Sequence, residues 1–167
     1  MRTSRPVLHD LERSRIEVIL EVLAFAGIVF LVAMPAYYYP HLPDSIPRHF
    51  NLRGEPDGWS GKGGLLLTPV TCVVMYVSLT VVSRFPHIFN YPWPITEANA
   101  RRQYTLSKQM MSAVKLNIVA IFSYITWGTI QTALGRQKGL SPSFAIISVP
   151  ILFAILGLYL FKGSRAQ

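Results

Sequence analysis

The sequence predicts an all-α integral membrane protein, a bundle of four transmembrane helices with an ordered loop outside the membrane. The composition is strongly apolar, because 51% of the 167 residues are hydrophobic and 14% are charged, against about a quarter charged in ordinary soluble domains. The hydrophobic residues also gather in four blocks, at 18–39, 65–82, 116–134 and 144–161. The blocks have 18 to 22 residues each, close to the roughly 20 that a helix needs to cross a hydrocarbon core. A soluble fold would require four buried helices almost without polar faces, so we set that class aside.

The distribution of cationic residues predicts the orientation of the bundle. Eleven of the 16 lysines and arginines fall in the N-terminal tail, in the connection 83–115 or after the fourth block, and the five others lie in the loops 40–62 and 135–143. Because cations favour the cytoplasmic side, both termini are predicted to be cytoplasmic and loop 40–62 to face outward. The net charge of +8 is therefore divided between the two sides of the membrane, and nucleic acid is not an expected partner.

The chain is predicted to begin with a basic cytoplasmic tail, residues 1–15, followed by a single membrane domain, residues 16–167. The first hydrophobic block is too long for the apolar region of a signal peptide, so we expect it to remain as a helix. Glu17 and Glu21 open this helix and, being four residues apart, share one of its faces. Glu21 is about one and a half turns inside the helix, where a carboxylate is costly unless it is paired or hydrated.

Loop 40–62 carries the densest group of chemically specific residues in the chain. Positions 54–58, GEPDG, are typical of a tight turn, since proline presets φ and glycine tolerates positive φ. We therefore expect a short β-hairpin or a turn-rich cap over the helix ends, with a tryptophan at the interface. The candidate binding residues in this loop are His41, Asp44, His49, Asn51, Asp57, Trp59 and Lys62.

Three interpretations of these loop residues remain open. They cap turns and satisfy the backbone of an irregular segment, or they form a docking surface for a peptide, a lipid headgroup or a partner subunit. In the third interpretation, His41, Asp44, His49 and Asp57 gather around a metal ion. The sequence has no HExxH or Cys/His spacing, so no metal ligand and no cofactor is assigned. It also has no nucleophile elbow, P-loop or GxGxxG, so no catalytic residue is assigned.

The connection 83–115 and the third block are the most polar part of the predicted membrane domain. The segment FPHIFNYPWP, residues 85–94, contains too many prolines for a helix, and Thr96 is the expected N-cap of a helix that runs without a break into the third block. Lys115 and Asn117 are its candidate intramembrane polar residues, and its small and hydroxylated residues are typical of helix–helix contacts. Lys115 either meets Glu17 or Glu21, or extends to the interface.

Two motifs of the loop resemble a known family. LPDxIPxHFN at 42–51 and GxPDGW at 54–59, followed by Lys62, are similar to the bacterial membrane domain of unknown function best known from the SdpI-type toxin-immunity proteins. The segments NYP at 90–92 and ITExNA at 95–100 are also similar, and the resemblance covers roughly residues 20–135. It implies a multi-pass helical protein of the bacterial inner membrane. For the named members it implies immunity to a secreted peptide toxin and signalling by sequestering a repressor. This chain is shorter than the SdpI proteins and lacks their second helical half.

The sequence and this resemblance together favour a non-enzymatic membrane protein with SdpI-like immunity to, or sensing of, an extracytoplasmic peptide. Its expected partners are the lipid bilayer and either a peptide toxin or a membrane protein complex. Two alternatives stay open: an accessory subunit of a larger membrane complex that packs through the polar third helix, and a metal-dependent membrane hydrolase that uses loop 40–62.

Overall fold

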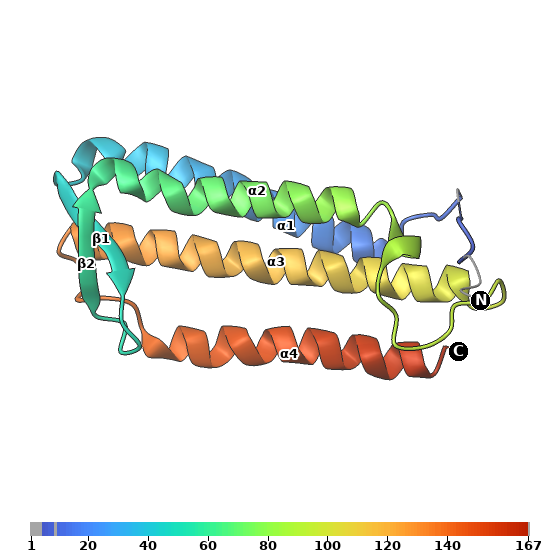
Figure 1. Ribbon diagram of the computed structural model, residues 1–167. Helices are drawn as coiled ribbons and strands as arrows, with labels where there is room; N and C mark the ends of the chain where they lie inside the picture. Colours follow the sequence, from blue (N-terminus) through green and yellow to red (C-terminus); the bar gives the residue numbers. More distant parts are fainter. Residues whose placement is uncertain (1–4, 9, 167) are drawn as a thin grey trace.

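The structure, a computed structural model, describes residues 5–8 and 10–166 and consists of four helices that run side by side (Figure 1). These are α1 (Arg15–Tyr38), α2 (Leu67–Val82), α3 (Ala100–Ala133) and α4 (Pro142–Ser164). Two antiparallel strands, β1 (Ser45–Phe50) and β2 (Pro56–Gly61), close one end of the bundle. We call this the hairpin end. The opposite end, which holds the connection between α2 and α3 and both ends of the described chain, is the terminal end.

The fold class predicted from the sequence is confirmed. The structure is mostly helical, all four helices are long and apolar enough to cross a membrane, and the polar loop after α1 contains the short hairpin. The predicted continuation of the connection into the third span is also found, because α3 runs unbroken for 34 residues. The predicted N-cap at Thr96 is wrong. The Asn99 side chain accepts from the Thr96 amide and donates to the Pro94 carbonyl, which closes a turn and moves the start of α3 to Ala100.

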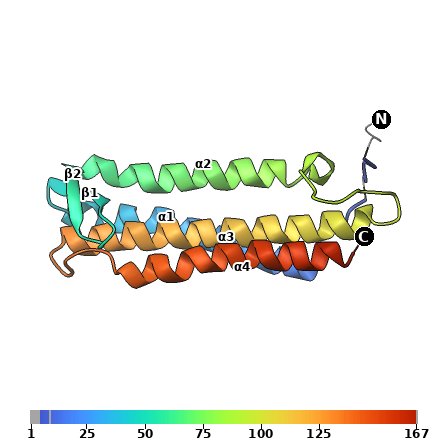
Figure 2. The ribbon, with the colours of Figure 1, turned by 60° about the horizontal axis from the view of Figure 1, so that its bottom comes forward.

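The most polar helix, α3, is the centre of the bundle. It packs against each of the other three helices, most extensively against α1, and Figure 2 shows it between α2 and α4. Polar residues in a membrane helix are stabilised when they face protein instead of lipid, and Gln103, Ser107, Ser112 and Thr126 of α3 are almost completely buried. Helices α1, α2 and α4 leave most of their apolar residues exposed, as helices in contact with lipid do.

An aromatic cap covers the terminal end. The guanidinium of Arg5 donates to the backbone carbonyls of His87 and Phe89 and lies 5.3 Å from the centre of the Tyr91 ring. The Tyr91 hydroxyl donates to the Pro86 carbonyl, and burial raises the pKa of this hydroxyl. The connection before α3 is therefore an ordered segment. Arg5 holds it on one side, and the first turns of α3 pack against it on the other.

Candidate functional site

The hairpin is fixed to the helices by an apolar base. Ile46 is buried in a cluster with Met34 of α1, Leu42, Leu65 and Ile130 of α3. The neighbouring residue Pro47 is also buried. The strand pairing is regular as far as Pro47 and becomes irregular only between Pro47 and Phe50, so β1 is covered on both faces at Ile46 and Pro47. This burial holds the base of the hairpin against α1 and α3.

The turn of the hairpin is organised by Asn51. Its side-chain oxygen accepts from the backbone amides of Arg53 (2.8 Å) and Glu55 (3.1 Å), and its side-chain amide donates to the Glu55 carboxylate (3.1 Å). Gly54 completes the turn with a φ of 80°, a conformation that glycine adopts without strain. In the structure Asn51 therefore has the turn-capping role, which was one of the three interpretations of the loop.

The other candidate loop residues form exposed pairs that do not converge. His49 and Asp57 face each other across the strands at 2.5 Å. The Lys62 ammonium lies 3.7 Å from Asp44 and 5.5 Å from the centre of the Tyr39 ring. His41 and Trp59 lie exposed elsewhere on the surface of this end. Within residues 5–8 and 10–166, no three His, Cys, Asp or Glu side chains gather closely enough to hold a metal ion.

The tip of the hairpin is tied to the loop between α3 and α4. The Leu140 amide donates to the Gly54 carbonyl at 2.7 Å. The two loops can approach this closely only because each has a glycine at the contact. A Cβ on Gly54 would overlap the Leu140 carbonyl, and a Cβ on Gly139 would overlap the Gly54 carbonyl. A single backbone hydrogen bond between two glycine-containing loops thus positions the tip over the ends of α3 and α4.

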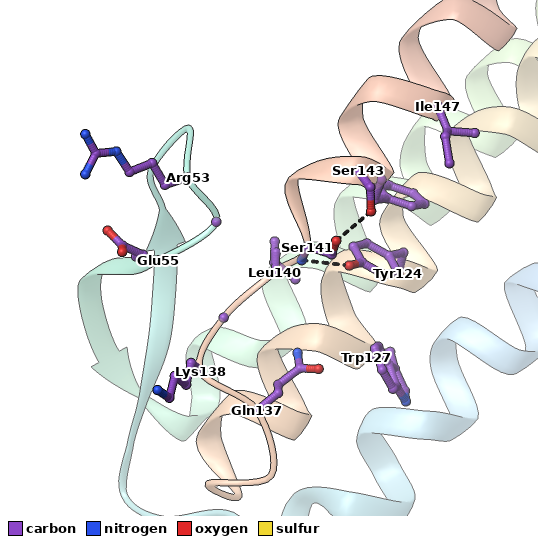
Figure 3. Close-up of a pocket in the computed structure, with 13 residues that line it drawn as sticks. Arg53, Glu55, Tyr124, Trp127, Gln137, Lys138, Leu140, Ser141, Ser143 and Ile147 are labelled. Carbon is purple, nitrogen blue, oxygen red and sulfur yellow. Dashed lines mark hydrogen bonds between the residues drawn. The ribbon is translucent and has the colours of Figure 1, made fainter.

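An open groove of about 620 Å³ lies between the hairpin tip, the α3–α4 loop and the adjoining helix ends (Figure 3). Its volume is within the usual range for ligand sites, roughly 300–1,000 Å³. The floor is aromatic: the rings of Tyr124 and Phe144 stack with centres 3.8 Å apart, and Trp127 lies beside Tyr124 and is 41% exposed. The floor is completed by Ile147 of α4.

The rim of the groove is polar and carries charges of both signs. Arg53 and Glu55 belong to the hairpin tip and Lys138 to the α3–α4 loop, and in Figure 3 their side chains point away from the helices. On the inner side, the Tyr124 hydroxyl accepts from the Ser141 amide at 3.0 Å, and Gln137 donates to the Gly128 carbonyl at 2.9 Å. The groove therefore combines a fixed apolar floor with a charged mouth.

The interpretation of the sequence missed this groove, because its walls come from three separate segments. The sequence feature that could have indicated a groove is the pair Tyr124 and Trp127, which lie three residues apart on one face of α3 near the end of the span. The polar residues around this pair are also typical of helix–helix packing, which hides the signal. The contribution of Arg53 and Glu55 depends on the contact between Gly54 and Leu140, which no local pattern reveals.

A second polar site is buried between α1, α2 and α3 near the terminal end. The Lys115 ammonium, which is completely buried, lies 2.6 Å from the Glu21 carboxylate and donates to the Thr80 hydroxyl at 3.0 Å. The other Glu21 contacts are with the hydroxyls of Ser112 (2.5 Å) and Tyr76 (3.5 Å). Lys115 therefore pairs with Glu21 inside the bundle and does not extend its side chain to the membrane interface.

Glu17 and Lys108 form a second ion pair one helical turn away, at 3.1 Å and with both side chains largely buried. The two pairs line a small cavity of about 50 Å³ together with Thr80, Ser83, Arg13 and Arg84. Asn117 does not join them; it donates to the Ser148 carbonyl of α4 at 3.4 Å. The sequence pattern predicts Lys108 to lie in the connection and not in this site, although its spacing of seven from Lys115 puts both on one face of α3.

The fold and these two sites define a small multi-pass membrane protein whose hairpin closes one end of a four-helix bundle. Residues 26–73, from the middle of α1 through the hairpin into α2, match the family model of a domain of unknown function (DUF1648). The chain is also similar to an uncharacterized protein of the archaeon Archaeoglobus fulgidus. The two are 23% identical over 148 residues, which cover 80% of this chain and 75% of the relative. No solved structure matches the chain.

Proposed function

We propose that this chain is a non-enzymatic membrane binding protein that senses, or gives immunity to, a peptide bound in the groove at the hairpin end. The observation that supports this proposal is the aromatic floor of Tyr124, Trp127 and Phe144 beneath a rim of mixed charge. Aromatic side chains give large contact area at low entropic cost and are frequent anchors in binding sites. A peptide supplies apolar side chains for the floor and both charges for the rim.

The proposed orientation places the groove outside a bacterial inner membrane and the terminal end in the cytoplasm, because the excess of lysine and arginine is at the terminal end. A secreted peptide would then reach the groove without crossing the bilayer. The hairpin tip forms one wall of the groove and is held by the Leu140–Gly54 hydrogen bond. Displacement of the tip is thus a direct way for a bound peptide to change the structure.

Cysteine labelling tests this orientation. Ser45 on β1 and Glu97 before α3 are both exposed, and the native Cys72 is buried and should react slowly. We expect an impermeant maleimide to label Ser45→Cys in intact cells and to label Glu97→Cys only after the membrane is opened. The reverse pattern would refute the orientation and, with it, access of a secreted peptide to the groove.

Peptide binding is tested by panning a random peptide display library on the protein in lipid nanodiscs, with empty nanodiscs as the subtraction. The enriched peptides should bind the Trp127→Ala variant at least 30-fold more weakly, about the 2 kcal/mol of a binding hot spot. Trp59→Ala is the matched control, because Trp59 is also exposed at the hairpin end but does not line the groove. Its affinity should stay within about threefold of wild type, a change of less than 1 kcal/mol.

Two results would count against the peptide site. The first is that no peptide is enriched over empty nanodiscs, and the second is that Trp59→Ala lowers the affinity while Trp127→Ala does not. Immunity is tested separately, by challenging a sensitive host with the enriched peptides while it expresses either the wild type or Trp127→Ala. Protection by the wild type alone would support immunity, whereas binding without protection would support sensing.

A second candidate function is an accessory subunit of a larger membrane complex. Among the four helices, α4 is the least buried and packs mainly against α3, so it has the widest face available to a partner helix as well as to lipid. Co-purification in mild detergent followed by mass spectrometry tests this candidate. Stoichiometric partner proteins would favour it, and their absence would favour the peptide-binding protein.

A further inference from the structure

The cavity between the two buried ion pairs has an excess of positive charge. It is lined by four cations, Arg13, Arg84, Lys108 and Lys115, and by two carboxylates, Glu17 and Glu21. Each carboxylate is paired with one lysine, so the two arginines are the source of the excess. Both arginines are exposed and therefore lie at the mouth, with the lysines behind them. A small cavity with this balance attracts an anion.

The hydrogen-bonding capacity inside the cavity is only partly used. The Lys115 ammonium is directed at Glu21, Thr80 and the Tyr76 ring. Within the described part of the chain, the Lys108 ammonium has Glu17 as its only ion-pair or hydrogen-bond partner, and a lysine ammonium has three donors. Glu17 is 4% exposed, and its oxygen Oε2 is buried without a partner among the described residues. The Glu17–Lys108 pair that lines the cavity therefore has spare donors and one unsatisfied acceptor.

These features describe the ligand. Free donors on Lys108 and on the two arginines require an anion, and guanidinium groups suit the geometry of phosphate. The unpartnered oxygen of Glu17 favours an anion that also has a hydrogen to donate, so a hydroxyl beside the phosphate suits the site. The volume of about 50 Å³ exceeds the space that a water molecule needs, roughly 10–15 Å³, and admits one small polar group.

The position of the cavity indicates where such a group would come from. Glu17 is in the first turn of α1, and Ser83 directly follows the last residue of α2. The cavity thus opens at the terminal ends of two membrane-spanning helices, at the depth of phospholipid headgroups. Basic pockets at this depth attract anionic lipids.

We propose that this cavity binds a phosphate group that carries a neighbouring hydroxyl, either the headgroup of an anionic glycerol-type phospholipid or free phosphate in its protonated form. The arginines and Lys108 hold the phosphate oxygens, and Glu17 Oε2 accepts from the hydroxyl. This site is at the opposite end of the bundle from the peptide groove and does not depend on the proposed function.

The test measures thermal unfolding in neutral detergent, with native mass spectrometry to count bound lipid. Four probes are added separately: phosphatidylglycerol, phosphatidylcholine, phosphatidylmethanol and inorganic phosphate. We expect one phosphatidylglycerol to stay bound and to raise Tm, and phosphatidylcholine to do neither. Phosphatidylmethanol has the same charge without a hydroxyl, so it should bind several-fold more weakly, as the loss of one hydrogen bond of about 1 kcal/mol implies.

Two double variants locate the site. Arg13→Gln/Arg84→Gln removes the charges at the mouth and should weaken phosphatidylglycerol binding at least tenfold. Arg102→Gln/Arg165→Gln is the matched control, because it removes two exposed charges from the same end without touching the cavity. Its binding should stay within about twofold of wild type, since exposed charges outside the site act weakly. All four positions are exposed, so folding should survive each change.

The results separate the two sources of phosphate. Stabilisation by inorganic phosphate alone, lost in Arg13→Gln/Arg84→Gln, would support the site with free phosphate as its ligand, and stabilisation by phosphatidylglycerol would support the lipid. Equal stabilisation by phosphatidylglycerol and phosphatidylcholine would overturn the proposal. Equal weakening in the two double variants would overturn it as well, because general charge attraction would then account for the binding.

Discussion

Replacing Lys115 with methionine should destabilise the bundle by about 3–5 kcal/mol, the usual cost of removing one partner from a buried ion pair. Lys115 is completely buried, and its ammonium lies 2.6 Å from Glu21 and 3.0 Å from Thr80. Methionine fills a similar volume but leaves the Glu21 carboxylate without its cation inside the bundle. The expected loss therefore comes from an uncompensated charge and not from a packing defect.

A double-mutant cycle with Glu21→Gln measures this interaction. The double variant Lys115→Met/Glu21→Gln contains no buried charge at this position, so it should be more stable than the sum of the single changes predicts, with a coupling of roughly 1–3 kcal/mol. Stability is followed by unfolding with a denaturing detergent, monitored by tryptophan fluorescence.

Lys62→Met is the matched control for Lys115→Met. Lys62 also pairs with a carboxylate, but at 3.7 Å from an exposed Asp44, and such surface pairs contribute less than about 1 kcal/mol. If Lys115→Met cost no more than Lys62→Met, the Glu21 carboxylate would have to be hydrated or protonated without its partner, and the buried pair would not stabilise the bundle.

The second large effect is expected at Gly54. Gly54→Ala introduces a side chain at a φ of 80° and drives it into the Leu140 carbonyl. The change should cost the roughly 1–2 kcal/mol of a left-handed alanine and should also separate the hairpin tip from the α3–α4 loop. The affinity of the groove for peptide should also decrease, because Arg53 and Glu55, which line the groove, belong to the displaced tip.

Three other glycines separate these two causes. Gly135 has a positive φ of 69° and open space around it, so Gly135→Ala isolates the backbone cost. Gly139 has no positive φ, so Gly139→Ala isolates the steric overlap with Gly54. Gly63 has neither a positive φ nor a close neighbour, so Gly63→Ala should have neither the backbone cost nor the overlap. Hydrogen exchange at the Leu140 amide is the direct measurement. It should accelerate in Gly54→Ala and Gly139→Ala and remain unchanged in Gly135→Ala and Gly63→Ala. Unchanged exchange in all four would contradict the anchoring role of this contact.

The sequence predicted the features that depend on local composition. Four apolar blocks predicted the four helices, and the GEPDG turn predicted the hairpin. The hydrophobic pattern also places Lys115 at the depth of Glu21, but depth alone is compatible both with an ion pair and with a side chain that extends to the interface. The structure has the ion pair. Thr96 failed as an N-cap because Asn99, three residues later, forms a tighter local turn.

The features that were missed depend on contacts between distant segments. Lys108 was assigned to an aqueous connection because α3 extends beyond the apolar block, and its partner Glu17 lies on another helix. The groove exists because Gly54 of the hairpin meets Leu140 of a different loop. The buried residues Ile46 and Pro47 are neighbours, so the burial pattern of β1 departs from the strict alternation expected of a half-buried strand.

The great length of α3 makes the protein sensitive to bilayer thickness. Its 34 residues extend over about 51 Å, about 20 Å more than a typical hydrocarbon core. The excess is at the terminal end, where α3 continues past the last residue of α2 and supports the aromatic cap. A thicker membrane would bring the exposed Arg13 and Arg84 at the mouth of the cavity towards hydrocarbon, and a thinner one would leave them in water. Bilayer thickness should therefore set how accessible this mouth is to ions and lipid headgroups.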